Sequence, residues 1–339
     1  MRLLVTGGAG FIGSAFIRIT LRTLADCRIV NLDHLTYAGN LENLAEAAGD
    51  ARYRFVKGDI ADAALVDALL RETRPDAIVH FAAESHVDRS ILGPRVFFET
   101  NLGGTFTLLE AARARQIGRF IHISTDEVYG SIPEQLEATE ESPLKPSSPY
   151  SASKAGSDML ALSYFTTYGT PVVVTRASNN YGPYQFPEKL IPLMIANALE
   201  DRPLPIYGDG LQMRDWLYVD DHCRAILALV EHGRPGEIYN IGGNTALENL
   251  DVVRRILKAA GKPESLIQRV SDRPGHDRRY ALSSAKIGRE TGWRPEVGFD
   301  DGLASTIAWY STHADWVRRV RSGEYLDYYR RNYEERGVA

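Results

Sequence analysis

The chain has few cysteines and no strong excess of charge of one sign. Only Cys27 and Cys223 occur among 339 residues, and neither belongs to a CxxC pair. A disulfide framework or a cysteine zinc site is therefore not expected, and a reducing compartment such as the cytoplasm fits. Lys and Arg number 39 against 44 Asp and Glu, a net charge of −5 without a basic block. This balance argues against nucleic acid or an anionic membrane surface as a partner.

Long hydrophobic runs are also missing. No stretch of about 18 apolar residues is present, so the sequence predicts no membrane-spanning helix. Hydrophobic residues make up 44% of the chain and charged residues 24%, which is typical of a globular protein with enough apolar side chains for a core. At roughly 150 residues a domain, the length suggests two domains, or one large α/β unit with an appendage.

Short apolar runs alternate with helical patterns through the first half of the chain. The runs show little polar alternation, which is typical of strands buried on both faces of a parallel sheet. Predicted strands cover 3–6, 29–32, 53–56, 77–81, 120–124 and 172–175, and predicted helices include 13–24, 64–72 and 104–115. Such alternation predicts an α/β fold: a doubly wound, parallel-sheet Rossmann domain with a smaller α/β substrate-binding domain.

The pattern changes after Arg176, where proline and glycine become frequent and the alternation stops. We therefore expect a Rossmann domain over 1–176 and a second domain mainly over 177–339. The segment 237–243 resembles one more strand of the main sheet, so a part of the chain near 216–243 is expected to return to the first domain. The tail after about Asp315, rich in Arg and Tyr, is expected to form a surface helix.

A glycine motif, Gly7-Gly8-Ala9-Gly10-Phe11-Ile12-Gly13, follows the first strand directly and opens the first helix. In this strand–turn–helix context the glycines permit a tight turn and let the backbone approach a pyrophosphate. The helix N-terminus adds unpaired N–H groups and a partial positive charge. The motif therefore predicts a dinucleotide site, and a glycine-rich turn without a ligand is the less favoured interpretation.

Polar and small residues follow the next strands. Asp33 ends the second strand, 20 residues after Gly13, where a carboxylate accepts hydrogen bonds from a ribose and repels a 2′-phosphate. NAD is therefore favoured over NADP. Asp59 ends the third strand, where an adenine contact and an N-cap of the following helix are compatible roles. Ala82-Ala83-Glu84-Ser85 ends the fourth strand and brings Ser85 toward the reacting centre.

Tyr150 and Lys154 form a Tyr-x-x-x-Lys pair just after Pro149, a residue suited to a helix start. The i, i+4 spacing places both side chains on one helical face. An ammonium beside a phenol favours phenolate, so Lys154 is expected to lower the pKa of Tyr150 and make it a base for an alcohol proton. A surface Tyr–Lys pair is the alternative, which the upstream dinucleotide motif disfavours.

Thr125, Asp126 and Glu127 follow the fifth strand, at the sheet edge where ligands bind in this architecture. Thr125 can hydrogen-bond a substrate hydroxyl. Two adjacent carboxylates in one dry cleft resist ionising together, so one keeps its proton and acts as acid while the other acts as base. A solvated acidic turn or an N-cap is the alternative. The histidines His80, His86 and His122 lack metal-ligand spacing, so no metal site is expected.

At this point the sequence resembles the extended short-chain dehydrogenase/reductase superfamily and, within it, the dTDP-glucose 4,6-dehydratase family. The glycine and Tyr-x-x-x-Lys motifs mark the superfamily only, and the resemblance runs from Gly7 to about Gly302. The more specific segments are 35–40, 82–90, 124–131, 178–190 and 273–280, of which the Asp126-Glu127 pair and the last two segments mark the dehydratases.

The resemblance implies a set of site residues. The catalytic group would be Thr125, Asp126, Glu127, Tyr150 and Lys154. Beyond the glycines, NAD contacts would be Phe11, Ile12, Asp33, Thr36, Asp59, Ile60, Ala82, Ala83, Thr100, Tyr150, Lys154 and Asn180. Contacts to the substrate dTDP-glucose would be Ser85, Thr125, Asn179, Lys189, Leu190, Pro205, Ile206, Tyr207, Arg214, Asn249, Arg273 and His276.

The resemblance also implies a redox-neutral reaction on a retained NAD, with oxidation at C4, loss of water across C5 and C6, and return of hydride to C6. A homodimer is implied through helices near 104–115 and 151–168. Three alternatives stay open: a dehydratase of another nucleotide sugar, a 4-epimerase on the same scaffold, and a dinucleotide-sensing protein without chemistry. The acid–base pair disfavours the epimerase, and the intact catalytic residues disfavour the sensor.

Overall fold

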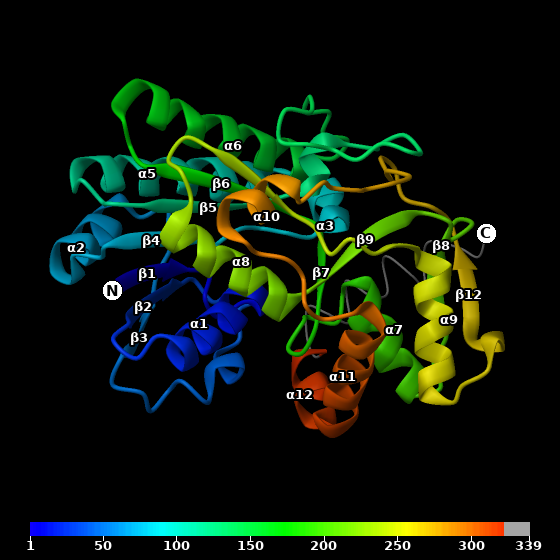
Figure 1. Ribbon diagram of the computed structural model, residues 1–339. Helices are drawn as coiled ribbons and strands as arrows, with labels where there is room; N and C mark the ends of the chain where they lie inside the picture. The colour runs from blue at the N-terminus through cyan, green and yellow to red at the C-terminus, as the bar shows by residue number, and fades with distance from the viewer. Residues whose placement is uncertain (322–339) are drawn as a thin grey trace.

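The computed structural model describes residues 1–321, and a seven-stranded sheet lies at the centre of this part of the chain (Figure 1). All neighbouring strands are parallel, in the order β10-β6-β5-β4-β1-β2-β3. The strands are β1 (Arg2–Thr6), β2 (Arg28–Asp33), β3 (Tyr53–Lys57), β4 (Ala77–His80), β5 (Phe120–Thr125), β6 (Val172–Ala177) and β10 (Ile238–Ile241).

Two helical layers cover this sheet because its strands bury side chains on both faces. In β1, Leu3 and Val5 point into one apolar core, and Leu4 points into the other. The first core is covered by α1 (Phe11–Thr23), α8 (Val219–His232) and α10 (Ala285–Thr291), and the second by α2 (Ala63–Thr73), α5 (Thr105–Ala114) and α6 (Pro149–Tyr168). Figure 1 shows α5 and α6 on the opposite side of the sheet from α1 and α8.

A second unit lies beside the sheet and has its own core around Tyr181, Trp216 and Ile256. Its strands are β7 (Asn179–Tyr181), β8 (Leu204–Tyr207), β9 (Met213–Tyr218), β11 (Ala246–Glu248) and β12 (Ile267–Val270). Its helices are α7 (Leu190–Leu199), α9 (Asn249–Ala260), α11 (Phe299–Thr312) and α12 (Ala314–Val320). Short elements complete the described residues: η1 (Leu41–Leu44), α3 (Val87–Leu92), α4 (Arg95–Phe97), the π-helix η2 (Phe98–Gly104), η3 (Asp126–Tyr129) and η4 (Glu264–Leu266).

The doubly wound parallel fold predicted from the sequence is confirmed. The strand expected over 237–243 is present as β10, which pairs in parallel with β6. Helix α8 precedes β10 and packs against α1, so this part of the chain does return to the sheet. The exact division into two domains stays a prediction. Helix α12 lies within the expected C-terminal helix, and the rest of that tail lies outside the described residues.

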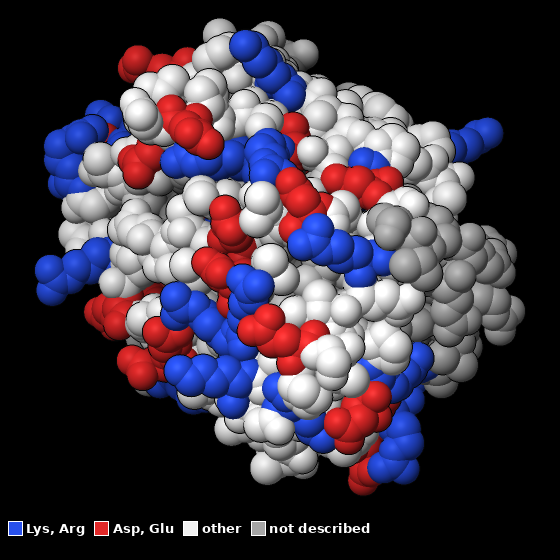
Figure 2. Space-filling view, turned by 90° about the vertical axis from the view of Figure 1, so that its right-hand side faces the viewer, with Lys and Arg blue, Asp and Glu red and all other residues white. Residues whose placement is uncertain are grey.

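The surface charge and the helices can be compared with two expectations from the sequence, the lack of a basic block and the lack of a membrane-spanning helix. Lys and Arg side chains are interspersed with Asp and Glu on the face that Figure 2 shows, without a large patch of one sign. Within residues 1–321, no helix is both long and apolar enough to cross a membrane.

The strand order indicates where a ligand-binding crevice lies. The chain leaves β1 toward β2 on one side, whereas β4 is followed by β5 on the other side. The loops after β1 and β4 therefore diverge, and open α/β sheets bind ligands where such loops separate.

Candidate active site

A cavity of about 330 Å³ lies at the carboxyl edge of the sheet, where the loops after β1 and β4 separate. It brings together residues that are spread over most of the described chain. All the predicted catalytic and cofactor residues line it: Gly7, Gly10, Phe11, Ile12, Gly13, Asp33, Thr36, Asp59, Ile60, Ala82, Ala83, Thr100, Thr125, Asp126, Glu127, Tyr150, Lys154 and Asn180. The predicted substrate residues Ser85, Asn179, Lys189 and Leu190 line it as well.

The glycine turn forms one wall of the cavity. Gly7 has φ +71°, and a Cβ there would lie 2.5 Å from the backbone nitrogen of Ala82. A Cβ on Gly13 would lie 2.4 Å from the carbonyl oxygen of Gly7. Helix α1 has Gly10 as its N-cap, whereas Asp62 and Ser148 cap α2 and α6 with their side chains. The first N–H groups of α1 are therefore available to an anion.

Two carboxylates line the cavity beyond this turn. Asp33 accepts hydrogen bonds from the backbone N–H groups of Ala9 and Leu35, both at 2.8 Å. Burial raises the pKa of Asp33, and these two hydrogen bonds oppose the rise. Asp59 accepts from the backbone N–H of Ala61 at 2.9 Å. Its predicted N-cap role is wrong: α2 begins later, at Ala63, and Asp62 caps it.

Helix α6 presents Tyr150 and Lys154 to the cavity. Ser148 forms a capping box, and Pro149 occupies the first turn, which fixes where the helix begins. The Lys154 ammonium donates to the carbonyl oxygen of Ile123 at 2.7 Å, and burial lowers its pKa to about 8. Burial also raises the pKa of Tyr150, and the charge of Glu127 adds to the rise. The expected lowering of the Tyr150 pKa by Lys154 is therefore not found, because desolvation of the phenolate is the larger effect.

The two carboxyl groups of η3 have different surroundings. Asp126 is 3% exposed, and its pKa lies well above its ordinary value because of burial and the nearby charges of Glu127 and Asp215. Burial also raises the pKa of Glu127, but the charges of Arg273, Lys189 and Arg214 oppose this rise. The surroundings of Asp126 therefore favour its protonated form, whereas three nearby cations favour the carboxylate form of Glu127. This difference suits Asp126 to donate a proton and Glu127 to accept one.

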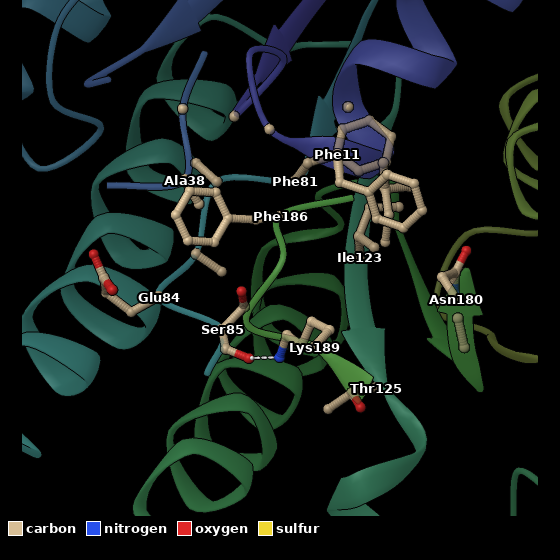
Figure 3. A pocket seen from close by; sticks show the side chains of 18 of the residues that line it. Phe11, Ala38, Phe81, Glu84, Ser85, Ile123, Thr125, Asn180, Phe186 and Lys189 are labelled. Atoms are coloured by element: carbon tan, nitrogen blue, oxygen red, sulfur yellow. Dashed lines mark hydrogen bonds between the residues drawn. The ribbon is translucent and has the colours of Figure 1, made fainter. Parts of the chain in front are cut away.

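Figure 3 shows how the lining residues lie. Phe11 and Phe81 lie beside α1, whereas Thr125, Ser85 and Lys189 lie together at a more polar part of the cavity. The Lys189 ammonium donates to the carbonyl oxygen of Ser85 at 2.7 Å. An apolar part therefore adjoins a part that carries hydroxyl, carboxyl and ammonium groups.

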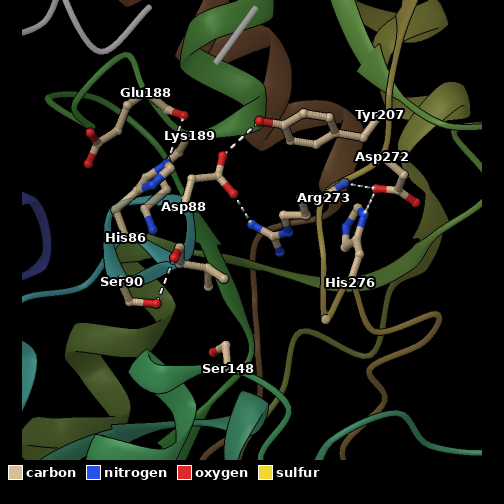
Figure 4. Close-up of polar contacts among 12 residues, drawn as sticks. His86, Asp88, Ser90, Ser148, Glu188, Lys189, Tyr207, Asp272, Arg273 and His276 are labelled. Atoms are coloured by element: carbon tan, nitrogen blue, oxygen red, sulfur yellow. Dashed lines mark hydrogen bonds and ion pairs between the residues drawn. The ribbon is translucent and has the colours of Figure 1, made fainter. Parts of the chain in front are cut away.

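The remaining predicted substrate residues do not line this cavity: Pro205, Ile206, Tyr207, Arg214, Asn249, Arg273 and His276. Several of them belong to a polar cluster around Asp88 (Figure 4). The Asp88 carboxylate accepts from the Tyr207 hydroxyl at 2.7 Å and from Arg273 at 3.1 Å. Ile206, by contrast, is 2% exposed and belongs to the core of the second unit.

The sequence missed three residues that shape the site. Asp88 orients Arg273, as described above. Asn101, in the π-helix η2, donates to the Glu84 carbonyl oxygen at 3.0 Å and accepts from the Glu84 N–H at 2.8 Å, which fixes the loop after β4. The sequence indicated Asn101 only through its neighbour Thr100, a predicted cofactor contact, because a π-helix has no clear sequence pattern.

His222 is the third missed residue. It lines the cavity, is fully buried, and has its Nδ1 2.9 Å from Oδ1 of Asn180. The Asn180 amide nitrogen donates to Ser178, so Oδ1 is its acceptor end and His222 Nδ1 is the donor. Burial lowers the His222 pKa to about 3, so the ring is neutral and its Nε2 is an acceptor, without a partner among the described residues. The cavity thus offers an acceptor to a ligand hydroxyl or amide.

Comparison with known proteins places this site in a family. The GDP-mannose 4,6 dehydratase family matches residues 4–306. The dTDP-glucose 4,6-dehydratase of Xanthomonas campestris is 54% identical over 95% of this chain and 96% of its own length.

Solved structures agree with these matches. The structure of the Streptomyces venezuelae dTDP-glucose 4,6-dehydratase, with NAD and TDP bound, has a TM-score of 0.92 and 54% identity, covering 94% of this chain and 100% of that one. The UDP-glucose 4-epimerase of Thermus thermophilus, in complex with NAD, is more distant, with a TM-score of 0.86 and 34% identity over 92% of this chain and 100% of its own. The chain therefore belongs to the dTDP-glucose 4,6-dehydratase family, within the wider group of GDP-mannose 4,6 dehydratase relatives.

Proposed function

We propose that the protein is an NAD-dependent dTDP-glucose 4,6-dehydratase, a hydro-lyase that converts dTDP-glucose to dTDP-4-keto-6-deoxyglucose and water. The observation that carries the proposal is the adjacent carboxyl pair Asp126–Glu127, which lines the same cavity as Tyr150 and Lys154. Oxidation alone needs only the tyrosine and the lysine. The loss of water needs a further acid and a further base, and the pair supplies both.

The cavity fits NAD. The uncapped N–H groups of α1 suit a pyrophosphate, and the carboxylate of Asp33 suits a ribose diol and disfavours a 2′-phosphate. The acceptor Nε2 of His222 suits a ligand N–H or O–H group. Bound in this cavity, NAD would supply the acceptor for the hydride of C4 and the donor of that hydride to C6 of the sugar. The cofactor is regenerated in each turnover, so it can stay bound throughout.

Tyr150 starts the reaction when its phenolate accepts the proton of the C4 hydroxyl. Because burial by itself raises the pKa of this phenol, the step needs the positive charges of Lys154 and of bound NAD beside the oxygen. Its phenol is 8% exposed, so water competes little for this proton. Lys154, held by the Ile123 carbonyl, presents a positive charge on the same helical face. Thr125 has its hydroxyl at the end of β5, where it can orient the sugar. These three residues prepare C4 for oxidation.

Glu127 and Asp126 then remove water. The ketone at C4 acidifies the C5–H bond, so Glu127 takes this proton as a carboxylate. Asp126 protonates the C6 hydroxyl, which leaves as water. When hydride returns to C6, C5 takes back the proton held by Glu127, so that the atoms balance. The charges of Arg273, Lys189 and Arg214 favour the ionised form of Glu127, whereas Asp215 and Glu127 favour the neutral form of Asp126. The same three cations are suited to the diphosphate of the substrate; Lys189 lines the cavity, and Arg214 and Arg273 lie beyond it.

Incubation of the purified protein with dTDP-glucose, without added NAD, tests the proposal. We expect a 4-keto-6-deoxy product, identified by mass spectrometry and by its ketone. UDP-glucose and GDP-mannose serve as matched substrates, and faster conversion of either would assign another nucleotide-sugar dehydratase activity. A sugar merely inverted at C4 would assign an epimerase, and an unchanged sugar would refute dehydratase activity.

We also propose that the enzyme is a cytoplasmic homodimer with a Rossmann domain over 1–176 and a nucleotide-sugar domain mainly over 177–339. Both cysteines are buried free thiols, which suits a reducing compartment. Large apolar side chains are exposed on η2, α5 and α6: Phe98, Phe106, Met159, Phe165 and Tyr168. Sedimentation equilibrium should give twice the chain mass, and Phe106→Glu should shift it toward one chain. A wild-type monomer would refute the dimer.

A further inference from the structure

Behind the catalytic residues lies a fully buried polar network that the reaction itself does not use. Asp158 lies on α6, one turn after Lys154, and its Oδ2 accepts from Nε of Arg176 at 2.9 Å. Nη1 of Arg176 donates to the Tyr129 hydroxyl at 2.9 Å, and this hydroxyl donates to Oδ1 of Asn240 at 2.8 Å. Every one of these four side chains belongs to a residue that is at most 2% exposed.

The network joins the two parts of the catalytic machinery. Tyr150, Lys154 and Asp158 follow one another at intervals of four residues and share one face of α6. Tyr129 is the last residue of η3, the short turn that carries Asp126 and Glu127. Arg176, on β6, therefore connects helix α6, which carries Tyr150 and Lys154, with the turn η3, which carries the two carboxyl groups.

Burial makes a purely stabilising role a poor explanation of this network. An ion pair removed from water gains little net stability over an apolar pair of the same volume, because both charges lose their hydration. The guanidinium is planar and has donors in a fixed fork, so it sets the positions of two partners at once. A second contact supports Asp158, whose Oδ1 lies 3.3 Å from Nε2 of His122 on β5.

We propose that Arg176 is a positioning residue, which holds the acid–base turn η3 in register with the Tyr150–Lys154 face of α6. Its Nε–Asp158 contact fixes the helix, and its Nη1–Tyr129 contact fixes the turn. Asn240 of β10 holds the same hydroxyl from the other side and donates to the Ala138 carbonyl oxygen at 3.0 Å. This inference rests on the proposed dehydratase function, because it assigns the two groups to successive steps.

The two contacts of Arg176 can be separated by Tyr129→Phe, which removes only the hydroxyl on the η3 side. In a single turnover with dTDP-glucose, NADH absorbance follows the oxidation at C4, and mass spectrometry of quenched samples follows the loss of water. We expect water loss to slow about tenfold, which is less than the ~100-fold cost of a 1 Å misplacement. NADH formation should stay within about twofold of the wild type, because α6 keeps its contact with Arg176.

Tyr239→Phe is the matched control. Tyr239 is the neighbour of Asn240 on β10, is equally buried, and has a hydroxyl that donates to Glu290 at 2.7 Å, outside the network. It should lower stability without changing the ratio of the two rates. Arg176→Lys is a second test, because a lysine keeps the charge beside Asp158 but lacks the fork, and it should change the ratio as Tyr129→Phe does.

The outcomes separate this inference from the function on which it rests. Wild-type protein that forms neither NADH nor the keto product would overturn the proposed function, and the positioning role with it. Wild-type turnover combined with an equal slowing of both steps in Tyr129→Phe would overturn the positioning role alone. Unchanged rates in Tyr129→Phe and Arg176→Lys would do the same.

Discussion

In the part of the site that we propose binds NAD, called the cofactor half, backbone groups next to strand ends hold the polar side chains. In the part that we propose binds the substrate, called the substrate half, side chains around Asp88 and Arg273 meet across the fold. The turn Gly7–Gly13 and the carboxylate of Asp33 are set by the local path of the chain, and Asp33 is held by two backbone N–H groups. Arg273, by contrast, is oriented by Asp88, 185 residues earlier in the sequence.

This difference indicates which half can vary between relatives that share a fold. Backbone contacts to a dinucleotide persist when side chains change, provided that the glycines remain. The substrate half depends on particular charged pairs, so it can be altered by single substitutions. We therefore expect substitutions of Tyr150, Asp126 or Glu127 to slow the reaction steps, and substitutions in the substrate half to weaken substrate binding.

The largest effect is expected at Tyr150. Tyr150→Phe removes the base for the C4 proton but keeps the ring, and general acid–base groups contribute about 10²- to 10⁴-fold. NADH formation on mixing with dTDP-glucose should fall by that factor, with KM within about threefold of the wild type. Near-normal NADH formation would show that another group accepts the C4 hydroxyl proton. It would also contradict the expectation that this residue affects the reaction steps and the substrate half affects binding.

A smaller effect, of about 100-fold, is expected for Asp126→Asn. This variant should still oxidise C4, because Tyr150 and Lys154 are intact, but water loss should slow and NADH should accumulate. Absorbance and quenched-sample mass spectrometry measure the two steps in one experiment. Water loss at the wild-type rate would show that Asp126 is not the acid. Glu127→Gln should give the same accumulation, because it removes the base of the same step.

All the predicted cofactor residues line the cavity, whereas seven of the twelve predicted substrate residues do not, and the reason is physical. Gly7, Asp33 and Lys154 follow strands or share a helical face, so spacing alone brings them together. No local pattern indicates that Asp88 meets Tyr207, 119 residues away, or that His222 reaches the cavity from α8. Such contacts depend on how the second unit packs on the first.

The pKa of Tyr150 shows a second limit of sequence reasoning. The spacing to Lys154 predicted a lowered value, but the amount of burial decides the sign of the shift, and burial is a property of the folded chain. That one carboxyl group of the Asp126–Glu127 pair acts as acid and the other as base stays a prediction. The sequence does not tell which of the two is the acid. That choice depends on Asp215, whose charge favours protonated Asp126, and on Arg273, whose charge favours ionised Glu127.

In the substrate half, Arg273→Ala should weaken substrate binding. A hydrogen bond to a charged group contributes roughly 1.5–3 kcal/mol, so KM should rise by about 10- to 100-fold. Arg278→Ala is the control, because Arg278 lies on the same segment but is exposed and pairs with Asp209 at 2.9 Å. Equal KM values for both variants would remove Arg273 from the substrate half. A loss of NADH formation at saturating substrate would instead place it in the chemistry.

The smallest effect is expected from pH. Burial lowers the pKa of Lys154 to about 8, so its positive charge is present below this pH and is lost as the pH rises above it. The rate of NADH formation should therefore fall by about tenfold for each pH unit above that point, well below the ordinary lysine pKa of about 10.4. Lys154→Arg keeps its charge at every accessible pH, so any activity that it retains should lack this alkaline fall. If the fall persists in Lys154→Arg, another group causes it, and the charge on α6 does not control the first hydride transfer.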